Sequence, residues 1–161
     1  MKKQKGFSLI ELLIVVAIIL IIAAIAIPNL LRSRMAANES SAVGTIRTLT
    51  TAEITYSTNY TLVGFGNLTS LGGAPGTCAT TATSTAACLV DDTIAQAPNQ
   101  KSGYTFSLTT AGAPTKVQFT SLAVPIVVGQ SGQRAFCSDQ SGVIRQNLLG
   151  TGCDVTVDPA L

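Results

Sequence analysis

The chain has 161 residues, of which 47% are apolar and only 11% are charged, and its formal net charge is +2. The charged fraction is well below the roughly 25% of typical domains, and a surface for nucleic acid needs clustered basic residues, so we expect no nucleic-acid partner. The chain has no His, which excludes Ser-His-Asp or Cys-His catalysis and a His-ligated metal site.

The first predicted element is an apolar helix near the N-terminus. Residues 9–27 form a run of 19 residues in which Glu11 is the only one that is not apolar. At about 1.5 Å per residue, a helix of this length spans the roughly 30 Å hydrocarbon core of a bilayer. The run therefore predicts a transmembrane helix. A secretory signal peptide is the alternative, but it has a shorter apolar core that a small-residue cleavage site follows.

The charges that flank this run predict its orientation. Lys2, Lys3 and Lys5 precede it, and Arg32 and Arg34 follow it. Three lysines at the extreme N-terminus favour a cytoplasmic N-terminus and export of the remainder of the chain.

Glu11 is the most informative residue of the apolar run. A carboxylate near the centre of a membrane helix costs about 2.5–3.5 kcal/mol on insertion scales. Because Glu11 lies only one turn into the run, one interpretation is an interfacial residue that reaches the headgroups. The other is a carboxylate that waits for a positive partner from another molecule.

The residues around Glu11 form a recognisable motif. A short basic leader ends in Lys5 and Gly6, Phe7 begins the apolar segment, Glu11 is the fifth residue counted from Phe7, and Pro28 closes the run. This pattern resembles the processing site of type IV pilins and of their relatives, the pseudopilins of type II secretion systems. The resemblance implies that a prepilin peptidase cleaves after Gly6 and N-methylates the new N-terminal residue, Phe7.

The resemblance also implies an assembly mechanism. Cleavage leaves an ammonium group on Phe7, and in a stack of helices the carboxylate of Glu11 can meet the Phe7 ammonium of a neighbouring subunit. That pair relieves two desolvated charges and fixes the axial offset between subunits. The implied partners are further copies of the chain in a helical filament, the inner membrane before assembly, and the pilus assembly machinery. The filament would be an extracellular type IV pilus used for adhesion or motility; a type II secretion pseudopilin is the alternative.

Past Pro28, which is expected to kink the helix and to take part in assembly, residues 29–60 remain compatible with a helix. Polar residues are expected opposite an apolar stripe, so this part should lie on the sheet of its own domain. The stripe comprises Ala42, Val43, Ile46, Leu49, Ala52, Tyr56 and Tyr60, and the polar set comprises Asn38, Glu39, Thr48, Glu53 and Thr55.

The remaining residues, 61–161, are predicted to form an exported domain. A Gly-rich and Pro-rich loop comes first, and strands are expected at 103–109, 116–120, 123–128, 134–138 and 143–146, with a hairpin turn at 139–142. Antiparallel strands after one long helix predict an α+β fold, which the resemblance identifies with the pilin fold. The expected organisation is a leader at 1–6, a transmembrane and assembly helix at 7–28, an amphipathic helix at 29–60 and the β-sheet domain at 61–161.

Four cysteines lie in the exported part, where disulfides form. Of the three possible pairings we favour Cys78–Cys88 and Cys137–Cys153, because each closes a local loop. Metal ligation is the alternative, but the chain has neither a CxxC motif nor a His. The resemblance supports disulfides, since many pilins staple the C-terminal segment with one.

No motif predicts an enzyme or a cofactor. The sequence has no nucleophile-base pair, no Gly-rich phosphate loop after a strand, and no carboxylates paired at a catalytic spacing. We therefore expect a structural protein without catalytic, cofactor or metal sites. A calcium site built from Asp139, Asp154 and Asp158 would favour the pseudopilin, but these residues also suit turns and a solvated tail.

Overall fold

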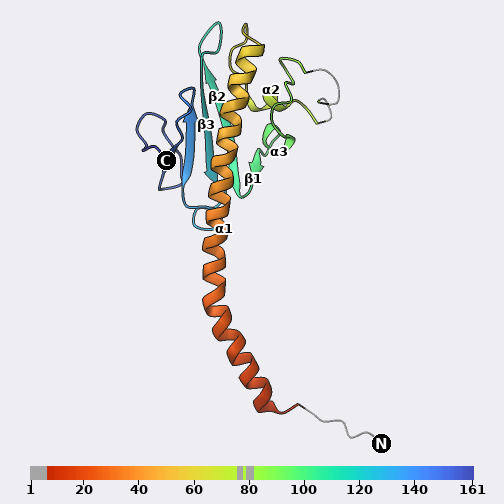
Figure 1. The fold of residues 1–161 in the computed structure, drawn as a ribbon, viewed down its shortest axis with the longest axis vertical. Helices are drawn as coiled ribbons and strands as arrows, with labels where there is room; N and C mark the ends of the chain where they lie inside the picture. Colours follow the sequence, from red (N-terminus) through yellow and green to blue (C-terminus); the bar gives the residue numbers. More distant parts are fainter. Residues whose placement is uncertain (1–6, 76–77, 79–81) are drawn as a thin grey trace, which may run out of the picture. The chain divides into compact units, whose positions relative to one another are not determined.

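The computed structural model describes residues 7–75, 78 and 82–161, so the expected leader at 1–6 lies outside the described residues. The chain divides into two compact units, Met1–Arg34 and Met35–Leu161. One helix, α1 (Leu9–Asn59), begins in the first unit and ends in the second (Figure 1).

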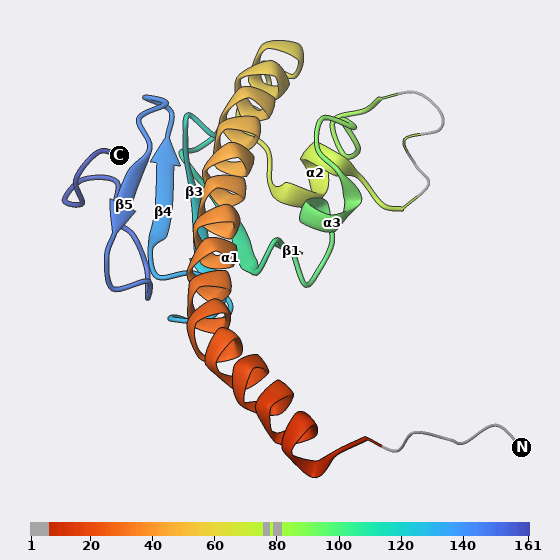
Figure 2. The ribbon, with the colours of Figure 1, turned by 60° about the horizontal axis from the view of Figure 1, so that its bottom comes forward.

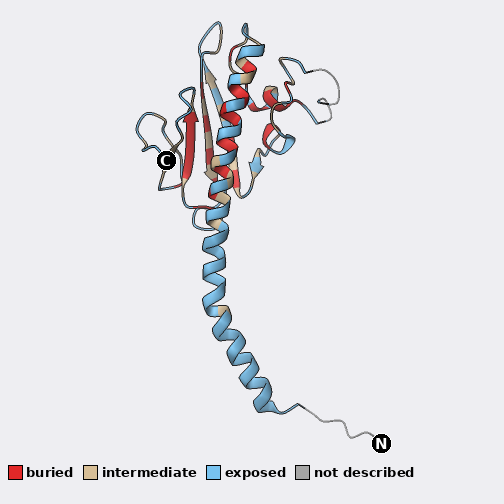
Figure 3. Cartoon of the chain, in the orientation of Figure 1, coloured by how far each residue is buried: buried red, intermediate tan, exposed pale blue. Residues whose placement is uncertain are grey.

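In the first unit, the side chains of the apolar run are almost all exposed (Figure 3). Phe7, with 82% of its surface exposed, precedes the helix. By length and composition, α1 is able to cross a membrane, and none of its most apolar window is buried. The helix continues through Pro28, although proline has no amide hydrogen and so leaves the carbonyl of Ala24 without its helical donor. The kink at Pro28 stays a prediction.

In the second unit, the rest of α1 packs on a five-stranded antiparallel sheet with the strand order β1-β2-β3-β4-β5. The strands are β1 (Gln100–Lys101), β2 (Tyr104–Ala111), β3 (Gln118–Pro125), β4 (Ala135–Asp139) and β5 (Arg145–Asn147). Each strand pairs with the next along the chain. This arrangement confirms the predicted α+β, pilin-like fold.

The structure corrects several predicted elements of this unit. In place of the two strands expected at 116–120 and 123–128 there is one strand, β3, which begins at Gln118 and ends at Pro125; the alternation of buried and half-buried residues continues through Ser121 and Leu122. Strand β1 and the short helices α2 (Leu68–Gly72) and α3 (Asp92–Ala95) were not predicted. Both helices carry a capping residue that could have been recognised: the side chains of Asn67 and Asp91 accept hydrogen bonds from amides of the first turn.

The core lies between α1 and the sheet, and α2 and α3 extend it along the side of α1 that is away from β4 and β5 (Figure 2). Its members from α1 include Ile46, Leu49 and Tyr56, which confirms the predicted apolar stripe. The sheet contributes Tyr104, Phe106, Ala123 and Phe136, and the short helices contribute Leu68, Leu71 and Ile94.

Two residues assigned to the solvated face of α1 are in fact buried. Glu39 is 8% exposed and Glu53 is fully buried. Positions 39, 46 and 53 are spaced by seven residues, about two helical turns, so both carboxylates lie on the same face as Ile46. The prediction was wrong because it used the polarity of these residues rather than their spacing.

Candidate functional site

The candidate assembly site is the first turn of α1. The Ser8 amide donates a hydrogen bond of 2.9 Å to Oε2 of Glu11. The Leu12 amide donates to the Ser8 carbonyl over 3.2 Å, a backbone bond with the four-residue spacing of an α-helix. A Ser that precedes a helix with Glu three residues later is the capping-box pattern, in which the Glu side chain satisfies an amide that the helix leaves unpaired. Glu11 therefore caps the helix on which it stands.

The same turn leaves Glu11 able to bind a second group. Its side chain is exposed, and Oε1 has no hydrogen bond to another described residue. Phe7 lies four residues before it, directly ahead of the helix. Pro28 lies about five turns further along α1, so the structure does not bring it to this turn. Gly6, at the expected cleavage point, lies outside the described residues.

A second arrangement, in Met35–Leu161, holds α1 to the sheet through Glu39. Oε2 of Glu39 accepts hydrogen bonds from Nε and Nη2 of Arg134 at 2.9 and 2.7 Å, and Oε1 accepts from the amides of Gln133 and Arg134 at 2.9 and 3.2 Å. Burial alone would raise the pKa of Glu39, but these donors outweigh burial, so the pKa is lowered. The guanidinium also lies 5.4 Å from the centre of the Phe136 ring.

Glu53, which lies two seven-residue repeats after Glu39 on the same face of α1, has a different environment. Its Oε2 accepts a hydrogen bond of 2.9 Å from the Gly66 amide, while Oε1 has no hydrogen-bond partner among the described residues. Burial raises the pKa of Glu53 to about 7, against the opposing effects of the Gly66 amide and the charge of Lys116. Near neutral pH the carboxyl group is therefore divided between its two protonation states.

Backbone hydrogen bonds to Lys116 hold residues 63–65, which precede the Gly66 amide that contacts Glu53. The Phe65 amide donates to the Lys116 carbonyl over 2.9 Å, and the Lys116 amide donates to the Val63 carbonyl over 3.2 Å. Gly64 has φ +79°, and a Cβ at this position would lie 2.1 Å from the Lys116 oxygen. Glycine is therefore the residue that this close approach of two backbones requires.

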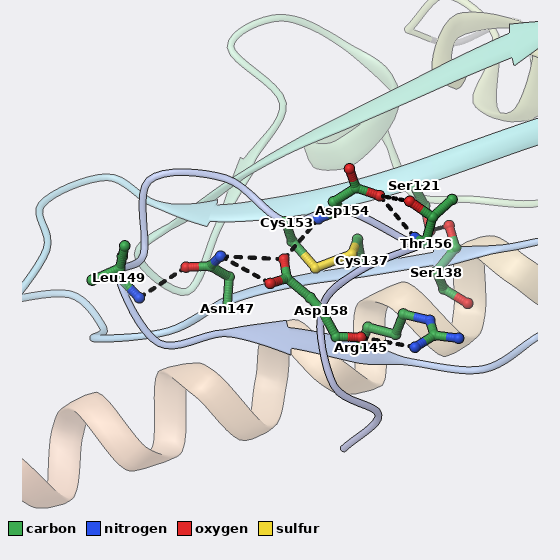
Figure 4. Close-up of a disulfide and its surroundings, with 10 residues drawn as sticks. All are labelled: Ser121, Cys137, Ser138, Arg145, Asn147, Leu149, Cys153, Asp154, Thr156 and Asp158. Carbon is green, nitrogen blue, oxygen red and sulfur yellow. Dashed lines mark hydrogen bonds between the residues drawn. A yellow bond between two sulfur atoms is a disulfide. The ribbon is translucent and has the colours of Figure 1, made fainter.

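Both favoured disulfides are present, and they involve all four cysteines. Cys78 is bonded to Cys88, and Cys137 of β4 is bonded to Cys153. Figure 4 shows that the second bond ties the C-terminal segment to the sheet.

Hydrogen bonds hold the rest of that C-terminal segment. The carboxylate of Asp158 accepts from the Asn147 side chain at 3.1 and 3.2 Å and from the Asp154 amide at 2.8 Å, and Arg145 donates to the Asp158 carbonyl (Figure 4). Hydrogen bonds from Thr156 hold the pKa of Asp154 below its usual value. Within the described ranges, no group of three or more His, Cys, Asp and Glu residues is placed to hold a metal ion, so the three aspartates weighed as a calcium site do not form one cluster.

Sequence reasoning thus paired the four cysteines correctly, and the roles of Phe7 and Glu11 stay predictions, but it missed three contacts of acidic side chains. The Ser8–Glu11 cap had a readable signal, the S-x-x-E pattern. The burial of Glu39 and Glu53 had one in their seven-residue spacing from Ile46. The choice of Arg134 as the partner of Glu39 had none, because 95 residues separate the two along the chain.

Comparisons with known proteins agree with the motif. Residues 1–27 match the family model described as the prokaryotic N-terminal methylation motif. The chain is 62% identical over 40 residues to the type IV wide pilus major component PilA4 of Thermus thermophilus, a match that covers 25% of this chain and 30% of that relative. It is 49% identical over 51 residues to the type IV major pilin protein PilA of Myxococcus xanthus, covering 32% of this chain and 23% of that relative.

The matches to these curated relatives thus span less than a third of their length. No solved structure matches the chain significantly. The chain carries the N-terminal methylation motif, is similar to type IV pilins over the stretches that match, and has a pilin-like α+β fold.

Proposed function

We propose that this protein is a pilin subunit that polymerises into a type IV pilus fibre on the cell surface. In this proposal a prepilin peptidase cleaves between Gly6 and Phe7 and methylates the Phe7 amine, which removes residues 1–6. Residues 7–28 then serve as membrane anchor and later as the filament core, residues 29–60 connect them to the domain, and residues 61–161 form the exported surface. The observation that carries the proposal is a carboxylate, Glu11, in the first turn of a long exposed apolar helix.

The exposure of the apolar run supports this function. Side chains such as Ile14, Ile18 and Ile22 are more than half exposed. Burial of a fully exposed side chain of this kind is worth about 1.5–3 kcal/mol, of which roughly half is still to be gained here. A single bilayer-spanning helix gains that energy from lipid first. Neighbouring copies of the same helix can replace the lipid during assembly, so close packing of these helices keeps the apolar surface out of water in the filament, and Glu11 supplies the register.

Glu11 would keep its capping bond while it binds the neighbour. Oε2 accepts from the Ser8 amide, and Oε1 is available to the ammonium of Phe7 from the next subunit. Within an apolar bundle, removal of one member of an ion pair leaves the other charge without compensation, at a cost of about 3–5 kcal/mol. A subunit out of register would incur this cost.

The experiment compares Glu11→Gln with Glu11→Ala and an unmodified control. Glutamine retains an oxygen that can accept from the Ser8 amide but cannot neutralise an ammonium, so it separates helix capping from charge pairing. Asp92→Ala, which removes an exposed carboxylate of the second unit, is the matched control. Filaments sheared from cells are counted by electron microscopy, and mass spectrometry of the N-terminus reports cleavage and methylation.

We expect both Glu11 variants to be exported, cleaved and disulfide-bonded but to give few filaments, while Asp92→Ala assembles normally. Normal filaments from Glu11→Gln would contradict charge pairing. Recovery of the unmodified protein only in the inner membrane, without sheared fibres that begin at Phe7, would favour the pseudopilin over the pilin.

A further inference from the structure

An exposed apolar patch lies on the second unit at the end where α1 enters it. We call it the end patch; its members are Ile126, Val127, Val128, Leu148 and Leu149, which are between 42% and 72% exposed. The first three follow β3 and the last two follow β5. The two loops lie near each other in both ribbon views, beside the residues of α1 that begin this unit (Figures 1 and 2).

Specific contacts join these two loops to each other. Gly150 lies against the loop that follows β3: a Cβ at Gly150 would be 2.6 Å from the Gln133 carbonyl oxygen and 3.1 Å from Cγ2 of Val128. The Val127 amide donates to the Ser131 hydroxyl over 3.0 Å, which closes the loop on itself. The end patch is therefore a defined surface that two parts of the chain build together.

Hydrogen bonds also tie the end patch to α1. Nδ2 of Asn38 donates to the Ser131 carbonyl over 2.8 Å, and the Gln133 amide donates to Glu39 over 2.9 Å. The position of the end patch within the unit is thus fixed relative to residues 38–39 of the helix.

The length of chain between Asn38 and the apolar run limits how far the end patch can be from a membrane. Leu30 and Leu31 are exposed apolar residues, and Arg32 and Arg34 follow them with charges suited to the headgroup layer. Asn38 is only four residues beyond Arg34, which corresponds to about 6 Å in a helix and at most about 14 Å in an extended chain. Every anchored subunit therefore holds the end patch close to the headgroups, whatever the orientation of its units.

The chemistry of the two loops suits lipid. Residues 126–133 and 148–152 include no charged residue, so contact with a bilayer surface desolvates no carboxylate or ammonium of these loops. Isolated exposed apolar residues are normal, but a contiguous set on one end of a domain marks an interaction site.

We propose that the end patch contacts the lipid surface of the membrane while the subunit is anchored, before assembly. This inference rests on the membrane anchoring that we propose for α1, and goes beyond it by assigning a second, peripheral lipid contact to the exported domain. The contact limits the orientations that the domain samples above the membrane, and entry into a filament breaks it. A second copy of the chain is the other possible occupant, and the experiment separates the two.

The chain has no Trp, so one introduced Trp reports on a single position. Leu149→Trp places the probe in the end patch. Leu62→Trp is the matched control, because Leu62 is 92% exposed and follows the C-terminal end of α1, away from Asn38. The cleaved full-length variants are reconstituted in vesicles of phosphatidylethanolamine and phosphatidylglycerol, with and without brominated acyl chains, and Trp emission is recorded on the floated fraction. Formation of both disulfides, measured by mass spectrometry, verifies folding.

We expect the emission of Leu149→Trp to move to shorter wavelength and to be quenched by brominated lipid, independently of the protein-to-lipid ratio, while Leu62→Trp does neither. Equal emission from the two variants in floated vesicles would overturn the lipid contact. A shift of Leu149→Trp that vanishes on dilution with lipid would assign the end patch to a second copy and overturn it as well. Failure of both variants to float would contradict the anchor itself and, with it, this inference.

Discussion

Glu39 and Glu53 are buried on the same face of α1, yet their pKa values are displaced in opposite directions. The difference lies in their donors. Glu39 accepts four hydrogen bonds, two of them from the guanidinium of Arg134, whereas Glu53 accepts one from the Gly66 amide and leaves an oxygen without a partner among the described residues. The four donors around Glu39 stabilise its ionised form, whereas burial with a single donor favours the protonated form of Glu53.

The raised pKa of Glu53 predicts that stability falls as pH rises. The pKa is 4.5 for the unperturbed group and about 7 in the folded protein, so between these values the folded state binds more protons than the unfolded state. The contribution is complete below pH 4.5 and is lost as pH rises through 7. Relative to Glu53→Gln, the free energy of unfolding of the unmodified protein should fall by up to about 3 kcal/mol between pH 4.5 and 8. Urea unfolding of the cleaved protein in detergent across this range measures it; parallel pH profiles would contradict it.

The lowered pKa of Glu39 has the opposite sign. Its stabilising contribution is present above the unperturbed value of 4.5 and is lost as pH falls through the lower folded pKa. At pH 7, Arg134→Met should lower the free energy of unfolding by about 1.5–3 kcal/mol, because hydrogen bonds to a charged group are lost. Lys101→Met is the matched control, since Lys101 pairs with Asp91 in an exposed bridge, 39% and 49% exposed, and should cost less than about 1 kcal/mol. Equal losses of unfolding free energy in the two variants would show that the burial of Glu39 does not strengthen its pairing with Arg134.

Substitution by alanine is expected to change the stability in opposite directions at two glycines. Gly64→Ala should destabilise the domain by several kcal/mol, because its φ is +79° and the new methyl would collide with the Lys116 carbonyl. Gly44→Ala, inside α1 and with no atom within 4 Å of the added Cβ apart from its chain neighbours and the backbone of the helix itself, should stabilise the domain by about 0.5–1 kcal/mol. Thermal unfolding followed by circular dichroism tests both, and a stabilising Gly64→Ala would refute the close approach.

The disulfides should contribute unequally. The Cys137–Cys153 bond closes a loop with a sequence separation of 16 residues, and Cys78–Cys88 closes one of 10. In the chain-entropy account a loop of about 15 residues is worth about 3 kcal/mol, and shorter loops are worth less. Replacing both Cys137 and Cys153 by Ala should therefore cost more stability than replacing Cys78 and Cys88. It should also expose the segment after Asn147 to proteases, which mass spectrometry of the fragments detects; an intact C-terminal segment would argue that the hydrogen bonds of Asp158 suffice.

The sequence by itself determined the parts of this protein that depend on local pattern. The apolar run predicted a membrane helix, because length and hydropathy carry that information. The processing and assembly roles of the leader, Phe7 and Glu11 are what the resemblance to type IV pilins implies. The Ile46, Leu49 and Tyr56 stripe predicted which face of α1 is buried. The two disulfides followed from short loop closure.

Only the tertiary structure decided the contacts between distant segments. It placed Arg134 beside Glu39, the Gly66 amide beside Glu53, and the Leu149 loop beside Val128. Polarity alone assigned both glutamates to solvent, and their seven-residue spacing from Ile46 would have placed them inside without naming their partners. A buried charge is stable only where particular donors meet it, and folding alone determines which donors, far away in the sequence, arrive there.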